Sequence, residues 1–187
     1  MSSPPVSDAA LIARVVVSDD RYAFGELVRR HQSAVRATLR KLTSGNTALA
    51  DDLAQETFLL AYRNLKSFRQ EARFSTWLYR IAYNAFLADA RKMKELPLSD
   101  EAESLAPADA AAGQGVARSA ALSIDLERAM AILSDAERAA IVQCYHNDLT
   151  HEEAAEVLGC PIGTVKTHIL RAKEKLRTRL GAWAPGH

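Results

Sequence analysis

The sequence of 187 residues has no apolar run near the roughly 18 residues that a membrane-spanning helix needs. It has only two cysteines, Cys144 and Cys160, whose spacing matches no usual zinc site, and it has no glycine-rich phosphate-binding loop. The first ten residues lack both the basic start and the apolar core of a secretory signal. We therefore expect a cytoplasmic protein with reduced thiols, no metal and no cofactor.

A net charge of only +1 hides an uneven distribution of charge. Residues 21–41, 67–95 and 161–187 each contain six Lys or Arg, against one, three and one acidic residues respectively. Acidic residues gather elsewhere, at 51–56, 100–109 and 127–156. Separate basic segments with acidic surfaces between them suit a protein with two kinds of partner, although ordinary solvated faces would give the same totals.

Signals for β-strands are nearly absent, and helical periodicity dominates the sequence. The period predicts helices at residues 9–18, 21–42, 48–65, 74–94, 123–133, 135–146, 151–158 and 163–180. Residues 95–121 are rich in Ala, Ser, Asp and Gly and contain no aromatic side chain, which is typical of a flexible acidic linker. We therefore expect an all-α chain of two small helical domains, residues 1–94 and 122–187, joined by that linker.

Two capping boxes, at residues 134–137 and 150–153, mark helix starts in the C-terminal domain. The helix from the second box would end at Gly159, because glycine adopts the left-handed conformation most readily. A tight turn at residues 160–163 and a longer basic helix from about Thr164 would follow. This order predicts a helix-turn-helix.

The second helix of that pair has an apolar and a polar face. The inward stripe, at about 100° per residue, comprises Ile162, Val165, Ile169, Ala172 and Leu176. Lys166, Thr167 and Arg171 lie opposite, where they could contact base edges in a major groove. His168, at the edge of the stripe, suits a phosphate contact or packing, and Lys175 continues the positive charge along the DNA backbone. The alternative is a surface helix that is basic by chance.

A second candidate surface lies on the predicted helix 48–65. Its inward stripe comprises Leu49, Leu53, Thr57 and Leu60, and a second strip comprises Asp52, Gln55, Glu56 and Leu59. An apolar side chain within a carboxylate strip is typical of a protein-binding face, whose acids would seek Arg or Lys on a partner. A solvated acidic face is the alternative.

Aromatic and basic residues alternate between residues 67 and 91. The segment contains Phe68, Arg69, Arg73, Ser75 and Thr76, then Trp77, Tyr79, Tyr83 and Phe86 on a predicted helix. Aromatic rings can stack on unpaired bases while arginines hold the phosphates. Arg80, Asn84, Leu87 and Arg91 share a strip that could track a DNA backbone. Core packing is the alternative for the aromatic side chains of the helix, and it is the favoured interpretation for Trp77.

Three segments together resemble the extracytoplasmic-function group of sigma factors, the smallest members of the sigma-70 family. They are Asp-Asp-Leu-Ala-Gln-Glu-Thr-Phe at 51–58, Phe-Ser-Thr-Trp-Leu-Tyr-Arg-Ile-Ala-Tyr-Asn at 74–84, and the helix-turn-helix segment at 159–172. Three motifs in this order, on both sides of a linker, are far more specific than any one of them. The resemblance covers both domains but neither the linker nor the extreme ends.

The resemblance implies a factor, not an enzyme, that directs RNA polymerase core to specific promoters and helps to open the −10 element. The N-terminal domain, residues 1–94, would be sigma region 2, and the C-terminal domain, residues 122–187, would be sigma region 4. Region 2 would dock on the clamp coiled coil of the β′ subunit through Asp51, Asp52, Gln55 and Glu56, beside Leu59. The loop 68–75, with Thr76, Arg80 and Asn84, would capture a flipped base and hold the −10 element. The helix from residue 163 would enter the major groove at the −35 element, with its domain on the β flap.

The usual regulator of the group is an anti-sigma factor, often membrane-anchored, that wraps both domains. One departure concerns the recognition helix. Many relatives carry Arg or Ser where this chain has Thr167 and His168, which leaves the −35 sequence open but not the mode of binding.

Two other functions are weighed against this one. A response regulator or repressor could carry the same helix-turn-helix, but it would need a receiver or ligand domain, and the N-terminal half lacks the alternating strands of a receiver. A di-iron carboxylate enzyme needs Glu-x-x-His on facing helices. No Glu stands three residues before His31, His146, His151 or His168.

Overall fold

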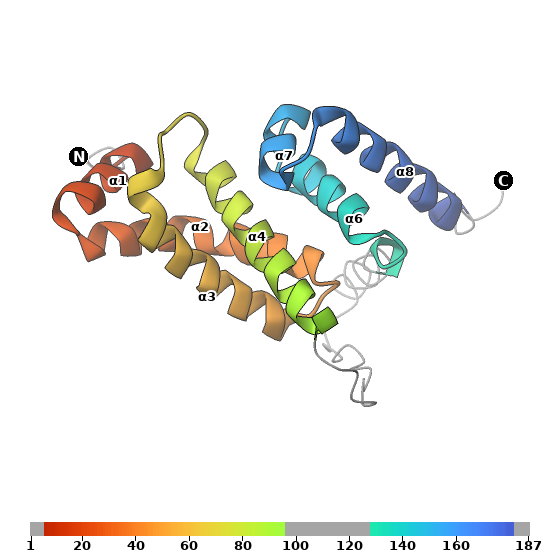
Figure 1. The fold of residues 1–187 in the computed structure, drawn as a ribbon, viewed down its shortest axis with the longest axis horizontal. Coiled ribbons are helices and arrows are strands. Elements are labelled where there is room, and N and C mark those ends of the chain that lie inside the picture. Colours follow the sequence, from red (N-terminus) through yellow and green to blue (C-terminus); the bar gives the residue numbers. More distant parts are fainter. Residues whose placement is uncertain (1–5, 96–127, 182–187) are drawn as a thin grey trace, which may run out of the picture.

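The computed structural model describes residues 6–95 and 128–181, and every regular element within them is helical (Figure 1). The elements are α1 (Asp8–Ser18), α2 (Arg21–Leu42), α3 (Thr47–Asn64), the 3-10 turn η1 (Leu65–Ser67), α4 (Phe74–Glu95), α6 (Asp135–Ile141), the π-helical turn η2 (Val142–His146), α7 (His151–Leu158) and α8 (Ile162–Gly181). The expected linker lies outside the described residues except for Glu95, which ends α4. In these described ranges no helix is both long and apolar enough to cross a bilayer.

The N-terminal unit consists of α1 to α4, and its first three helices begin at side-chain caps. Ser7, Asp20 and Asn46 accept hydrogen bonds from the backbone amides of Ala10, Ala23 and Leu49. The buried face of α3 differs from the expected stripe. Leu49 and Leu60 are only half-buried, whereas Ala50, Ala54 and Ala61 are fully inside. Small side chains on this face let α3 approach its neighbours α2 and α4 closely.

The C-terminal unit confirms both predicted capping boxes. Gly159 ends α7 with φ +63°, as the left-handed cap requires. Helix α8 begins earlier than expected, at Ile162, because the carbonyl of Pro161 already accepts bonds from the amides of Thr164 and Val165.

The predicted helix 135–146 changes character at its end. After Ile141 the chain widens into the π-turn η2, closed by a bond from the Asn147 amide to the Val142 carbonyl. In this turn the buried side chain of Gln143 accepts a bond from Asn147 at 2.8 Å. Of the predicted helix 123–133, the described part is helical at 128–130, and residues 131–133 form a turn.

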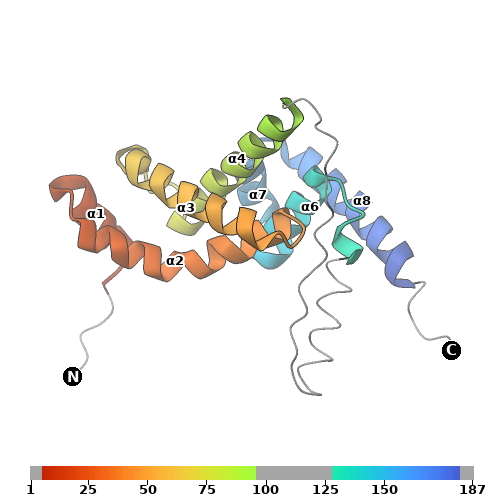
Figure 2. The ribbon, with the colours of Figure 1, turned by 90° about the horizontal axis from the view of Figure 1, so that it is seen from below.

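The two units pack against each other rather than standing apart. Helix α4 lies along α7, and α2 contacts α6 and η2 (Figures 1 and 2). Buried apolar side chains of both units form one continuous cluster. The described residues thus form a closed arrangement in which region-2-like and region-4-like helices share a core.

Polar contacts cross the same seam. Thr38 of α2, fully buried, donates a hydrogen bond from Oγ1 to Asn147 Oδ1 at 2.8 Å. Arg138 of α6, also buried, donates from Nη1 to the carbonyl of Leu42, the last residue of α2, at 3.2 Å. A guanidinium suits this place because the C-terminal carbonyls of a helix carry partial negative charge.

Candidate functional site

The acidic strip on α3, defined as Asp52, Gln55, Glu56 and Leu59, is exposed along its whole length. Leu59 keeps 60% of its surface open. Neither Asp52 nor Glu56 forms an ion pair with another described residue. Asp51 differs, because its Oδ1 lies 3.5 Å from Nε of Arg36 on α2 and the residue is half-buried.

An apolar groove of about 570 Å³ runs between α2 and α3 beside this strip. Its lining includes Phe24, Val28, Phe58, Leu59 and Tyr62, with Gln55 at the edge shared with the strip. The rings of Phe24 and Tyr62 meet edge to face at 4.8 Å. The groove was not predicted from the sequence, although Phe24 and Val28 stand four residues apart on one helix face, a spacing that indicates a shared apolar surface.

The loop between η1 and α4 lies on a cluster of three aromatic rings. Phe68 lies 5.6 Å from Phe74 and 5.2 Å from Trp77, and Phe74 lies 5.7 Å from Trp77, measured between ring centroids. Phe68 and Trp77 are half-buried and pack against the core cluster, which agrees with the core packing favoured for Trp77. Arg69 and Arg73 project from the loop as exposed side chains.

The remaining residues predicted to contact the −10 element separate into two groups. Arg80 and Asn84 are exposed on α4, together with Arg91, and Ser75 is half-buried. Thr76 is 2% exposed, and its hydroxyl has no hydrogen-bond partner within the described ranges. This position takes Thr76 out of reach of a ligand on the surface of the closed arrangement.

Three aromatic side chains of α4 pack in the core instead of facing solvent. Tyr79, Tyr83 and Phe86 are 8%, 7% and 8% exposed, on the helix that meets α7. Burial raises the pKa of both tyrosine hydroxyls. The core-packing interpretation is therefore confirmed for these three residues.

The recognition face of α8 is open to solvent. Lys166, Thr167 and Arg171 are exposed, as is Leu170 at 59%, while Val165, Ile169 and Ala172 are buried as the stripe predicted. His168 is half-buried at the edge of the stripe.

Lys175 has an internal role that its sequence position did not indicate. Its Nζ lies 2.7 Å from Oε2 of Glu137, a carboxylate whose side chain is only 6% exposed. Burial tends to raise the pKa of Glu137, but hydrogen bonds from Lys175 and from the Ser134 amide outweigh it and hold that pKa below its usual value. Lys175 therefore links α8 to α6.

A second groove, of about 760 Å³, lies between the two units. Arg36, Arg40, Lys41 and His146 line it, together with Ala37, Met130, Ile141, Val142 and Tyr145. Arg40 and Lys41 form no ion pair with any described acidic residue. Burial, assisted by the charge of Lys41, lowers the pKa of His146. The groove therefore combines apolar walls with uncompensated positive charge.

Family profiles and known proteins match both units of the chain. The profile described as Sigma-70 region 2 matches residues 27–95, and that described as Sigma-70, region 4 matches residues 123–176. The ECF RNA polymerase sigma-E factor of Haemophilus influenzae is 34% identical over 94% of this chain and 96% of its own length. The ECF RNA polymerase sigma factor SigM of Mycobacterium tuberculosis is 37% identical over 94% and 85%.

Two solved structures share the arrangement. CnrH, in complex with the cytosolic domain of CnrY, superposes with a TM-score of 0.67 at 27% identity, covering 94% of this chain and 97% of that one. The sigma factor RpoE, in complex with the anti-sigma factor NepR from Bartonella quintana, gives 0.66 at 27% identity, covering 84% and 96%. The chain therefore belongs to the sigma-70 family, in its extracytoplasmic-function group.

Proposed function

We propose that this chain brings RNA polymerase core to specific promoters through three separate surfaces. The acidic strip and the adjoining groove between α2 and α3 dock on the polymerase. The loop 68–73 and the exposed residues Arg80 and Asn84 hold the −10 element. The exposed face of α8 reads the −35 element.

The observation that carries the docking role is the exposure of Leu59 among unpaired carboxylates. A leucine at 60% exposure beside an apolar groove leaves hydrophobic surface that a partner would cover. Asp52 and Glu56 flank it without internal ion pairs, so they are available to basic side chains of that partner. Complementary charge around an apolar centre is the usual anatomy of a protein interface.

The DNA-reading roles rest on exposure and side-chain chemistry. Lys166, Thr167 and Arg171 lie in the first half of α8, the end of a recognition helix that usually enters the major groove. Arg69 and Arg73 stand beside the half-buried rings of Phe68 and Trp77. Arginines next to partly open rings suit an unpaired strand, whose phosphates and bases they can hold together.

We also propose that an anti-sigma factor controls the chain, because the similar sigma factor RpoE is bound to the anti-sigma factor NepR in its solved structure. The groove between the units suits an amphipathic acidic helix, because Arg40 and Lys41 line apolar walls and lack internal partners. Such a regulator can be identified by two-hybrid selection. Its binding is then measured to the variant that carries both Arg40→Glu and Lys41→Glu, which we expect to bind it more weakly than the wild type does. A regulator that binds this variant as well as the wild type docks elsewhere.

The polymerase-docking role is tested by reversing charge at Asp52→Lys and Glu56→Lys together. Removing one partner of a desolvated charge pair costs about 2–5 kcal/mol. We expect the variant to lose binding to core polymerase in a pull-down titration while its helicity, measured by circular dichroism, stays at the wild-type level.

The matched control is Glu95→Lys with Glu156→Lys, which changes the net charge equally at exposed positions outside the strip. We expect this control to bind core polymerase normally. Unchanged binding by the Asp52/Glu56 variant, or equal loss by the control, would remove the strip from the interface.

A further inference from the structure

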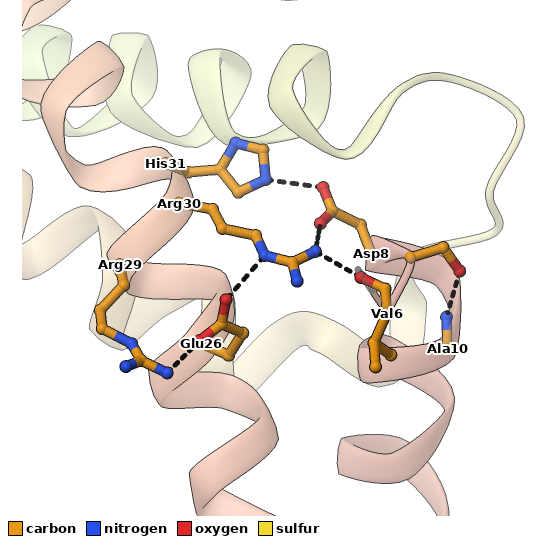
Figure 3. A network of polar contacts seen from close by, with 8 residues as sticks. Val6, Asp8, Ala10, Glu26, Arg29, Arg30 and His31 are labelled. Atoms are coloured by element: carbon orange, nitrogen blue, oxygen red, sulfur yellow. Dashed lines mark hydrogen bonds and ion pairs between the residues drawn. The ribbon is translucent and has the colours of Figure 1, made fainter. Parts of the chain in front are cut away.

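A polar network joins the start of α1 to the middle of α2 (Figure 3). Asp8 lies between two basic side chains, with Oδ2 at 2.7 Å from His31 Nε2 and Oδ1 at 3.0 Å from Arg30 Nη1. Arg30 also donates to the Val6 carbonyl at 2.6 Å and to Glu26 at 2.9 Å. Burial raises the pKa of Asp8, but the bonds from His31 and Arg30 outweigh that effect and leave the pKa lowered.

His31 also contacts the aromatic cluster of the loop 68–73, which consists of Phe68, Phe74 and Trp77. Its ring meets the ring of Phe74 edge to face, with centroids 5.2 Å apart and planes at 76°. Phe74 is 6% exposed, is the first residue of α4, and contacts the rings of both Phe68 and Trp77. The carboxylate of Asp8 therefore fixes a histidine ring that supports the end of the loop.

The other end of α1 reaches the segment that precedes the loop. Asp19, the C-cap of α1, accepts a hydrogen bond from the Tyr62 hydroxyl on α3. This bond raises the pKa of Tyr62. Helix α1 also packs against η1, the turn from which the loop departs. Helix α1 thus contacts η1 on one side of the loop directly, and it reaches Phe74 on the other side through His31 of α2.

We propose that Asp8 and His31 are positioning residues for promoter opening, which act by holding Phe74 and, through it, the loop 68–73. This inference rests on the −10 role of that loop given above. Holding reactive or binding groups in place lowers the entropy lost when they engage, so a loosened loop slows opening without removing a DNA contact. Polymerase docking and −35 reading use other surfaces, and we expect neither to change.

The test separates promoter binding from promoter opening. Asp8→Asn weakens the bond to His31, and His31→Phe removes it while keeping an aromatic edge on Phe74. With core polymerase and a promoter labelled by 2-aminopurine in the −10 element, the affinity of the closed complex and the rate of opening are measured separately. We expect Asp8→Asn to slow opening about tenfold, the equivalent of about 1.4 kcal/mol, with unchanged closed-complex affinity, and His31→Phe to slow it less than Asp8→Asn does.

Two further variants make the outcome decisive. Arg14→Ala breaks a different α1–α2 ion pair, with Asp20 at 2.7 Å, that does not touch the aromatic cluster, and it should open promoters at the wild-type rate. Arg73→Ala tests the loop itself. If Arg73→Ala leaves opening unchanged, the proposed −10 role is wrong. If Arg73→Ala slows opening but Asp8→Asn does not, or if Arg14→Ala slows it equally, the positioning role is overturned.

Discussion

At the scale of single residues, the environment separates side chains that the sequence presents as equivalent. Arg171 and Lys175 are both basic and exposed on α8, four residues apart. Lys175 is paired with the buried carboxylate of Glu137, whereas Arg171 forms no ion pair with a described residue. We therefore expect them to affect DNA binding differently.

Replacing Arg171 with Ala tests base reading. We expect affinity for the preferred −35 site to fall by about 1–3 kcal/mol and selectivity to relax at one or two positions, because base contacts carry the specificity. Lys175→Ala should weaken all sequences alike. Selection from a randomised −35 library measures both. If Arg171→Ala kept the wild-type preference while only its affinity dropped, Arg171 would be a phosphate contact.

We also expect Lys175→Ala to lower the free energy of unfolding by an amount that depends on pH. A carboxyl group whose pKa is lowered by folding stabilises the protein above its ordinary value of about 4.3, and that contribution disappears as pH falls through the folded pKa. Because Lys175 is half-exposed, we expect a loss of about 1 kcal/mol at pH 7. Thermal unfolding at a series of pH values from 7 downward should show the stability difference between the variant and the wild type shrinking as the pH falls. A difference that does not shrink with falling pH would have another cause.

At the scale of elements, the helix ends that could be predicted from the sequence are those fixed by residues within a few positions of the end. The two capping boxes and Gly159 are readable because a hydroxyl, a glutamate and a glycine each satisfy nearby backbone groups. The π-turn η2 could not be predicted from local sequence, because Asn147, which bonds Gln143 there, also accepts a hydrogen bond from Thr38, which lies 109 residues earlier. The alanine face of α3 was not predicted either. Helical periodicity is judged from large apolar side chains, whereas alanines are buried there because α3 lies close to its neighbouring helices.

Gly159 gives the sharpest test of the turn between α7 and α8. A Cβ there would meet no atom within 4 Å, so the cost of Gly159→Ala comes from its φ of +63° alone. We expect a loss of about 1 kcal/mol in unfolding free energy. Gly25→Ala, in open space within α2 and without a positive φ, should stabilise by about 0.5–1 kcal/mol. Urea unfolding of both variants measures the contrast, and a shift of the same sign in both would refute this reading of the turn.

At the scale of the whole molecule, we expect the seam between the units to open during initiation. The −10 and −35 elements are separated by more than one turn of DNA, whereas α4 packs directly on α7 in the closed arrangement. The seam is part polar, through Thr38 with Asn147 and Arg138 with the Leu42 carbonyl. Each of these hydrogen bonds contributes about 0.5–1.5 kcal/mol to holding the units together, and both must be exchanged for water when the seam opens.

Thr38→Val tests this seam while keeping its shape. Loss of one net hydrogen bond is worth about 0.5–1.5 kcal/mol, so we expect the open population to rise by about two- to tenfold. Energy transfer between one dye on α2 and another on α8 measures the fraction of molecules in which the two units are apart. Thr57→Val is the matched control, because the equally buried Thr57 hydroxyl bonds only the Leu53 carbonyl of its own helix at 2.7 Å. The Thr38 hydroxyl also lies 2.9 Å from a carbonyl of its own helix, that of Ala34, so the two variants differ in the bond across the seam. Equal opening by both variants would mean that the hydroxyl of Thr38 does not hold the units together.

The central claim is that this chain gives RNA polymerase core its choice of promoter. Purified chain and core polymerase are incubated with a DNA library randomised at both the −10 and −35 positions, and the transcribed templates are sequenced. We predict that transcription starts only in the presence of the chain, from templates sharing two short elements at a fixed separation, and that Arg171→Ala alters only the upstream one. Initiation that is equal without the chain, or that shows no shared elements, would contradict the account.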